Sequence, residues 1–246
     1  MLRSFSRGSS PGPDGFRPDW YKQFLSAQTP ERTQSFLAAL ARFTNIGLKG
    51  QLPPRLSQYF SSAALTPLAN SVEHAVRPVC VGNALRHLLA KVGMDYAQEK
   101  ARHHFTIQQV GLGVPCGGEA VAHAMSSIIK LLNKDWPSDE FMYIIQVDYS
   151  NAFNLCDRAT MFREVRQVIP GLAHWVEWCY GSTNPLLFLS DGSVIANCKG
   201  VQQGDPLGAL LFSLVNHVMV RKLVDRFPTL PLNVWFMERR GRGDTA

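Results

Sequence analysis

The stretch Gln146-Val147-Asp148-Tyr149-Ser150-Asn151-Ala152-Phe153 organises this chain of 246 residues. A run of apolar and aromatic residues, Phe141 to Val147, leads into the carboxylate of Asp148, and the turn-forming Ser150 and Asn151 follow. This pattern predicts a buried strand that ends by presenting Asp148 at a sheet edge or cleft. An acid in that place is costly unless it is paired, hydrogen-bonded or bound to a metal. The stretch alone leaves two alternatives open, in which Asp148 either caps the next helix or belongs to a site.

The composition is that of a globular, mildly basic protein. Apolar residues make up 46% and charged residues 18%, and the formal net charge is +6 at pH 7. The length allows one large or two small domains, with enough residues to bury a core. A basic balance suits a polyanionic partner, although a solvated basic surface explains the same charge.

The cysteines are scattered and form no Cys-x-x-Cys pair; they are Cys80, Cys116, Cys156, Cys179 and Cys198. An odd number without a signal peptide favours a reducing compartment and argues against a zinc site. No apolar run approaches the length of a membrane span. We therefore expect an intracellular protein, nuclear or cytoplasmic, that has no membrane partner.

Helix and strand patterns alternate along the chain. Helices are expected at 29–47, from Asn83, and at 119–132, 157–168, 174–180 and 209–224. Strands are expected at 63–68, 141–147 and 231–237, and in a hairpin over 185–196 that turns at Asp191-Gly192. The helix after Asn83 has leucines on one face, and its other face holds Arg86, His87 and Lys91. The glycine-bearing loop 200–208 opens onto a long apolar helix, whose free N–H groups suit an anion.

Five motifs follow one another along the chain: GPDGF (12–16), RPVCVGNALRHLLAK (77–91), QVGLGVPCGGEAVAHA (109–124), QVDYSNAFN (146–154) and GVQQGDPLG (200–208). In these motifs and their order the sequence resembles the reverse transcriptase domain of non-LTR (LINE-like) retrotransposons. Each motif is weak alone, but five in order are strong, and together they cover about Ser9 to Met237. The resemblance implies an α/β right-hand polymerase fragment with an antiparallel palm sheet packed by helices. Residues 1–130 would form mostly fingers and 131–237 mostly palm, interleaved, with a basic tail at 238–246 and no thumb.

The resemblance also implies a magnesium-dependent site. By resemblance Asp148 is the catalytic aspartate that bridges two magnesium ions, and the backbone carbonyl of Tyr149 adds a ligand. Phe153 resembles the bulky residue beneath the incoming sugar, which leaves no room for a 2′-hydroxyl. The implied partners are an RNA template, a DNA primer and deoxynucleoside triphosphates.

Further nucleotide-binding residues follow from the same resemblance. Gln203 and Gly204 resemble the segment that contacts the nucleotide and the template base. Arg77 lies in the fingers pattern near the triphosphate. A lysine usually found upstream has no counterpart in Pro67–Glu73.

The chain departs from the family pattern after Phe236. The family continues into an aromatic-x-Asp-Asp hairpin whose two aspartates complete the metal site, whereas Met237-Glu238-Arg239-Arg240 follows here. A guanidinium has no acceptor for a cation, so we expect weak or lost magnesium binding and an inactive fragment. We interpret the residues after Met237 as a frameshift product. Asp-Asp-Gly in another frame of the genomic DNA would support this interpretation, and its absence from every frame would refute it.

Two alternatives to a polymerase fragment are a non-catalytic nucleic-acid-binding or interaction protein derived from a retroelement, and a pseudogene product without a selected role. Primer extension that depends on Asp148 would favour the enzyme. Salt-sensitive binding of an RNA–DNA duplex without extension would favour the binding protein. Insolubility on expression would favour the pseudogene product.

Overall fold

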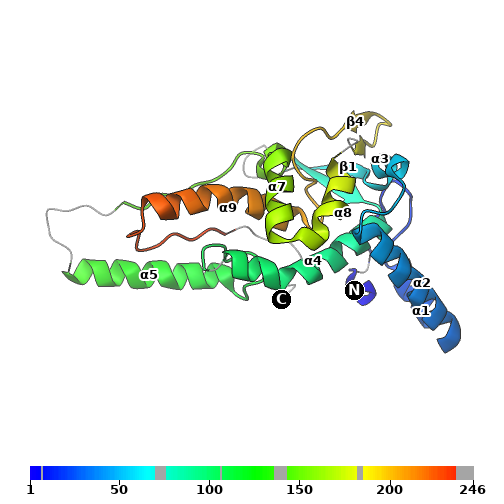
Figure 1. The fold of residues 1–246 in the computed structure, drawn as a ribbon, viewed down its shortest axis with the longest axis horizontal. Coiled ribbons are helices and arrows are strands. Elements are labelled where there is room, and N and C mark those ends of the chain that lie inside the picture. Colours follow the sequence, from blue (N-terminus) through cyan, green and yellow to red (C-terminus); the bar gives the residue numbers. More distant parts are fainter. Residues whose placement is uncertain (7, 70–75, 106, 136–142, 182–184, 237–246) are drawn as a thin grey trace.

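The computed structural model describes residues 1–6, 8–69, 76–105, 107–135, 143–181 and 185–236. Figure 1 shows a central body from which α5 projects at one end and α1 with α2 at the other. The helices are η1 (Leu2–Ser4), α1 (Trp20–Ala27), α2 (Pro30–Leu48), η2 (Pro54–Leu56), α3 (Ser57–Phe60), α4 (Ala84–Phe105), α5 (Gly117–Asp135), α6 (Ala152–Leu155), α7 (Arg158–Val168), α8 (Pro170–Tyr180) and α9 (Gly208–Arg226). The strands are β1 (Ala63–Ala69), β2 (Val76–Gly82), β3 (Leu186–Phe188) and β4 (Val194–Ala196).

The described strands form one sheet in the order β2-β1-β3-β4. β1 and β2 pair antiparallel, with Ala63 opposite Gly82, and β3 and β4 also pair antiparallel. β1 and β3 run parallel, with Ala63 opposite Leu187. The expected mixture of helices and strands is therefore confirmed, but the sheet in the described part of the chain is mixed rather than antiparallel.

Local sequence rules placed several elements correctly. Thr29 caps α2 by accepting the N–H of Arg32 at 3.5 Å, and Pro30 follows in the first turn. Asp157 caps α7 by accepting the N–H of Thr160 at 2.7 Å. Gly192 has φ +84° in the turn between β3 and β4. The two caps depend on the side chains of Thr29 and Asp157, and the turn depends on a glycine that tolerates positive φ. All three residue types are visible in the sequence.

The strand expected over 141–147 is wrong for residues 143–147, which have no regular secondary structure, while 141 and 142 lie outside the described residues. Tyr143 is 83% exposed and Ile145 is 84% exposed. A strand needs a neighbour for its backbone groups, and β1 to β4 do not supply one here.

The strand expected over 231–237 is reduced to an isolated parallel bridge between Trp235 and Gln109. The N–H of Trp235 donates to the carbonyl of Gln108 at 2.6 Å, and the N–H of Val110 donates to the carbonyl of Trp235 at 3.0 Å. This segment therefore pairs with the loop before α5. Met237 and the expected tail at 238–246 lie outside the described residues, as does part of Pro67–Glu73.

The main core lies where α4, α7, α8 and α9 meet. Trp175 and Trp178 stack at 5.6 Å between ring centroids, and Met161 and Leu210 are fully buried beside them. A second cluster joins Phe5 and Tyr21 of the N-terminal segment to α4. None of the helices in the described ranges is long and apolar enough to cross a membrane.

Candidate functional site

The loop 200–208, which joins β4 to α9, is where the candidate residues gather. The N–H of Val201 donates to the carbonyl of Phe153 at 2.8 Å, which ties the loop to α6. The N–H of Cys80 donates to the carbonyl of Gln203 at 2.7 Å, which ties the loop to β2. Gly204 has φ +122°, and a Cβ there would collide with the carbonyl oxygen of Cys80. Only glycine fits this close approach of two backbones.

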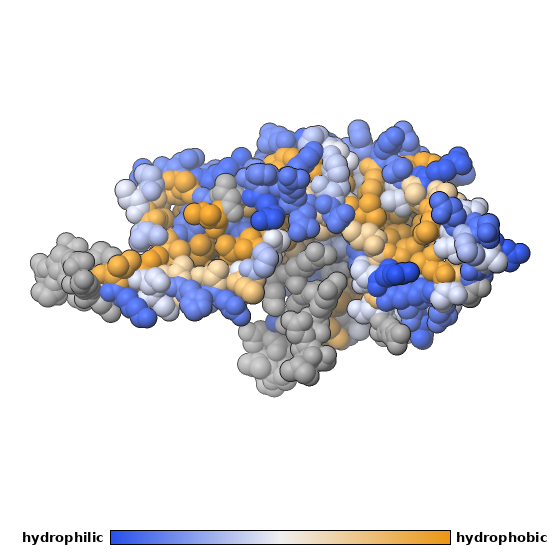
Figure 2. All heavy atoms as spheres, turned by 90° about the horizontal axis from the view of Figure 1, so that it is seen from below, coloured by the Kyte–Doolittle hydropathy of each residue, from blue (hydrophilic) through white to orange (hydrophobic). Residues whose placement is uncertain are grey.

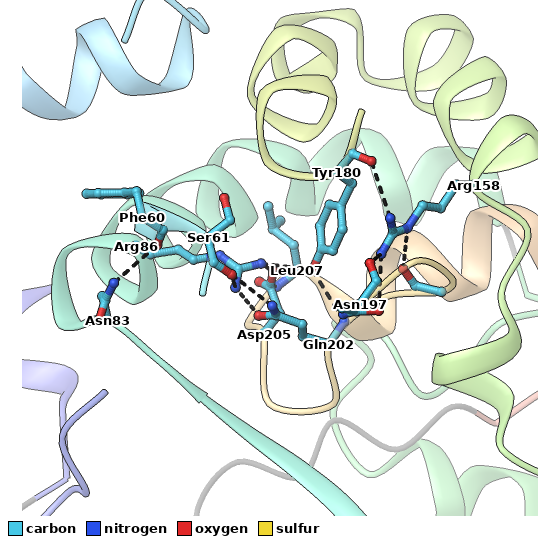
Figure 3. Close-up of polar contacts among 11 residues, drawn as sticks. Phe60, Ser61, Asn83, Arg86, Arg158, Tyr180, Asn197, Gln202, Asp205 and Leu207 are labelled. Atoms are coloured by element: carbon cyan, nitrogen blue, oxygen red, sulfur yellow. Dashed lines mark hydrogen bonds and ion pairs between the residues drawn. The ribbon is translucent and has the colours of Figure 1, made fainter. Parts of the chain in front are cut away.

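A buried arginine, Arg86 of α4, binds the side chains of this loop (Figure 3). Arg86 is 3% exposed, and its Nη2 lies 2.8 Å from Oδ2 of Asp205. The same guanidinium donates to the Tyr180 hydroxyl at 2.9 Å, to the Ser61 carbonyl at 2.8 Å and to Oε1 of Gln202. Arg86, expected on the polar face of its helix, is therefore the centre of a buried network.

The ionisation of this network follows from its burial. Burial opposes the charge of Arg86, but Tyr180 and Asp205 more than offset this and raise its pKa. Burial, reinforced by Asp205, raises the pKa of Tyr180 well above its usual value. Tyr180 therefore stays neutral, and its hydroxyl donates to Oδ2 of Asp205 at 2.9 Å while it accepts from Arg86.

A second arginine holds the start of the loop. Arg158 of α7 donates to the Gly200 carbonyl at 2.8 Å and to the Asn197 carbonyl at 2.7 Å (Figure 3). Its guanidinium carbon lies 5.2 Å from the ring centroid of Tyr180, and that of Arg86 lies 5.5 Å from the same centroid. Cations at this range attract an aromatic ring, so both arginines are linked through Tyr180.

The structure places Phe153 of α6 against the loop 200–208, which contains Gln203 and Gly204. The ring centroid of Phe153 lies 5.7 Å from that of Phe212 on α9, and its ring edge lies 3.4 Å from where a Cβ on Gly208 would be. Arg77 is exposed on β2, three residues before Cys80, which corresponds to about 10 Å along a strand. Arg77 therefore lies on the strand that binds the loop through Cys80, but the Cys80–Gln203 hydrogen bond does not involve it.

Asp148 is exposed, and its Oδ1 accepts the N–H of the next residue, Tyr149, at 2.9 Å. It does not cap α6, because the N-cap position is Asn151, at φ +54°. The hydroxyl of Tyr149 donates to Oδ1 of Asn216 on α9 at 2.7 Å, and burial raises its pKa. The tyrosine side chain therefore ties the segment to α9, while Asp148 faces solvent.

The described residues do not fit a two-metal centre. They contain no group of three or more His, Cys, Asp or Glu side chains that could hold a metal ion. Asp205 is the other acid in the motifs around the loop, but its carboxylate is 5% exposed and is paired with Arg86. Hard cations need several oxygen ligands. Of Asp148 and Asp205, the described acids of the two motifs at this loop, these contacts leave only Asp148 accessible.

No family model matches the chain. Over 239 residues, 93% of the chain, it is 24% identical to the retrotransposable element SLACS 132 kDa protein of Trypanosoma brucei gambiense. The match supports a retroelement origin. The chain spans 18% of the length of that protein.

The sequence interpretation missed Arg86, Tyr180 and Asp205 as members of one network. One signal was present in α4, where Ala90, Gly93 and Ala97 repeat at helical spacing in line with Arg86, and all are buried. A stripe of small residues at this spacing predicts close helix packing on that face. Arg86, which lies at the N-terminal end of this stripe, was therefore a candidate for burial beside an acidic partner.

Proposed function

We propose that this chain is a fingers-and-palm fragment of the RNA-directed DNA polymerase (reverse transcriptase) domain of a non-LTR retrotransposon, and that it lacks polymerase activity. Two findings support the proposal: five motifs in family order, and the similarity to a retrotransposable element protein over most of the chain. The observation that carries it is the contact of Phe153 with both ends of the loop 200–208, at Val201 and at Gly208, between which Gln203 and Gly204 lie.

In this proposal the loop 200–208 receives a deoxynucleoside triphosphate opposite an RNA template. Gln203 and Gly204 contact the nucleotide and the template base, Phe153 lies under the sugar, and Arg77 contributes positive charge near the triphosphate. A Phe153→Ala variant should prefer dGTP over GTP less strongly than the parent chain does, because no ring excludes the 2′-hydroxyl. An unchanged preference in competition binding would refute the role of Phe153.

The proposed inactivity follows from the carboxylates. Related polymerases use two magnesium ions, which supply charge stabilisation when several acids hold them. Here Asp148 is accessible, with the Tyr149 carbonyl beside it, and Asp205 is withheld by Arg86. We therefore propose that magnesium binds weakly or not at all, and that an RNA template, a DNA primer and deoxynucleotides remain the binding partners.

Primer extension tests the proposal. The full chain is incubated with an RNA template, a DNA primer, magnesium and all four deoxynucleotides, beside an Asp148→Asn variant. We expect no extension by either protein, together with duplex binding that weakens as salt rises. Extension by the parent chain that Asp148→Asn abolishes would overturn the claim of inactivity. Absence of both duplex and dGTP binding would overturn the polymerase assignment.

A second candidate is a non-catalytic nucleic-acid-binding protein derived from a retroelement. The net charge of +6 favours it, as does the pairing of Asp205 with Arg86, which leaves Asp148 as the accessible acid of the two in the described loop motifs. Salt-sensitive duplex binding without any binding of dGTP would select this candidate. Binding of both would select the polymerase fragment.

A further inference from the structure

We infer that Arg86 is the positioning residue for deoxynucleoside triphosphate binding at Gln203–Gly204, an inference that rests on the proposed function. Its guanidinium contacts the side chains of Gln202 and Asp205, the residues immediately before and after the Gln203–Gly204 pair. The Arg86 hydrogen bonds to the loop are made to these two flanking residues, Gln202 and Asp205. Arg86 thus holds the Gln203–Gly204 segment at both of its ends (Figure 3).

The loop needs such an anchor because it has no regular secondary structure of its own. Residues 201–207 belong to no helix or strand, so their backbone position depends on individual contacts. Oδ1 of Asp205 accepts the N–H of Leu207 at 2.9 Å, while Oδ2 takes the ion pair with Arg86. One carboxylate therefore links the guanidinium to the start of α9.

The other contacts of Arg86 relate the loop to the sheet and to α8. Ser61 lies just before β1, and Tyr180 is the last residue of α8; both bind the guanidinium. The side-chain amide of Gln202 also donates to the Ser61 carbonyl at 2.8 Å. The cavity between Gly82, Arg86 and the loop holds about 10 Å³, roughly one water molecule. A shift of the loop away from Ser61 and Tyr180 would break these hydrogen bonds.

Lysine cannot reproduce this arrangement. The acceptors on Ser61, Gln202, Tyr180 and Asp205 surround a planar group with five donors, whereas an ammonium has three donors on one atom. Arg86→Lys retains the charge that compensates Asp205 but loses the planar array. It should therefore fold and hold the loop loosely.

The first test compares the parent chain with Arg86→Lys and with Arg166→Lys, a matched change at an exposed arginine of α7. Binding of mant-dGTP is measured on full chain loaded with an RNA–DNA primer–template, and duplex affinity and Tm are measured in parallel. We expect Arg86→Lys to weaken mant-dGTP binding at least about tenfold, with duplex affinity unchanged. Hydrogen exchange should accelerate at the amides of Gln203 and Gly204. Equal mant-dGTP affinity or unchanged exchange at these amides would overturn the inference.

The second test separates positioning from stability with Arg86→Met combined with Asp205→Asn. This pair removes both buried charges, and the asparagine oxygen still accepts the N–H of Leu207. We expect the double variant to recover most of the Tm lost by Arg86→Met alone while mant-dGTP binding stays weak. Recovery of parental mant-dGTP affinity would show a purely structural role and overturn the inference. A parent chain that binds duplex but no mant-dGTP would instead refute the proposed function, and the inference with it.

Discussion

Arg86 and Asp205 show at the residue scale that a buried charge is useful only with its partner. Both side chains are 5% exposed or less, and Tyr180 adds a neutral hydroxyl to each. Desolvation of two charges offsets much of their attraction, so the intact pair contributes little net stability. Removing one partner leaves the other charge buried and unpaired, which is costly.

Asp205→Ala should therefore lower the free energy of unfolding by about 3–5 kcal/mol. Asp225→Ala, at an exposed acid on α9, should change it by less than about 0.5 kcal/mol. Urea denaturation of both variants measures the difference. Similar small losses in the two variants would contradict the buried pair.

A second residue-scale prediction concerns pH. His217 of α9 is 5% exposed, and its ring lies 4.7 Å from that of His104 on α4. Burial, with His104 and Arg221, lowers the pKa of His217 to about 4, against the opposing effect of Glu164 on α7. The pKa of His104 is lowered too, by burial and Arg221.

Because the folded state disfavours protonated His217, stability is retained above the unfolded pKa of 6.5 and falls as the pH drops from there toward 4. The loss should approach roughly 3 kcal/mol from His217 alone. His217→Phe should flatten part of this slope in urea denaturation between pH 7 and 4, and the remainder should come from His104. His103→Phe, at an exposed position, should leave the slope unchanged. A parental slope in His217→Phe would count against this assignment.

At the element scale, the loop 200–208 and α9 act together. The sequence predicted both the glycine-bearing loop and the helix behind it, and both are present. The motif did not reveal that the loop packs directly on β2. In the structure Gly204, at φ +122°, lies against the Cys80 carbonyl.

Gly204→Ala should therefore be more harmful than Gly192→Ala. Gly192 also has positive φ, +84°, but a Cβ there would meet nothing within 4 Å. Its alanine variant should lose only about 1 kcal/mol from backbone strain. Gly204→Ala adds a backbone collision and should lose more than about 2 kcal/mol. Equal losses in thermal unfolding would contradict the close approach.

At the scale of the whole molecule, exposed apolar side chains occur at both ends, and the segment 143–147 presents several of them close together. Tyr143, Ile144, Ile145 and Val147 are each more than half exposed, and Figure 2 shows further apolar side chains over the end of the molecule where α5 lies. Consecutive exposed residues with strand propensity promote association between chains.

Ile145→Lys should reduce aggregation without lowering Tm, because the side chain is 84% exposed and packs against little. Ile107→Lys is the matched control, since Ile107 is 81% exposed but lies outside this apolar segment. Light scattering during incubation at fixed concentration measures the effect. A comparable reduction by both variants would assign it to net charge alone.

The sequence by itself determined the elements whose signals are local. The helix expected from Thr29 and the turn expected at Asp191-Gly192 are present, and the helix expected over 157–168 is α7 with Asp157 as its cap. The long helix after loop 200–208 followed from its apolar run. The ordered motifs also led to the retroelement similarity that the comparison supports. Caps, turns and apolar spacing depend on neighbours along the chain, which a sequence displays directly.

Tertiary structure alone decided which residues share a network and which strands find partners. Arg86 looked like a surface residue, and its burial depends on Ser61, Tyr180 and Asp205, which lie far away in sequence. The apolar run before Asp148 looked like a strand, yet its described residues have no place in the sheet. Backbone pairing and charge burial are settled by distant groups, because the free energy of a strand or a buried ion depends on what meets it in space.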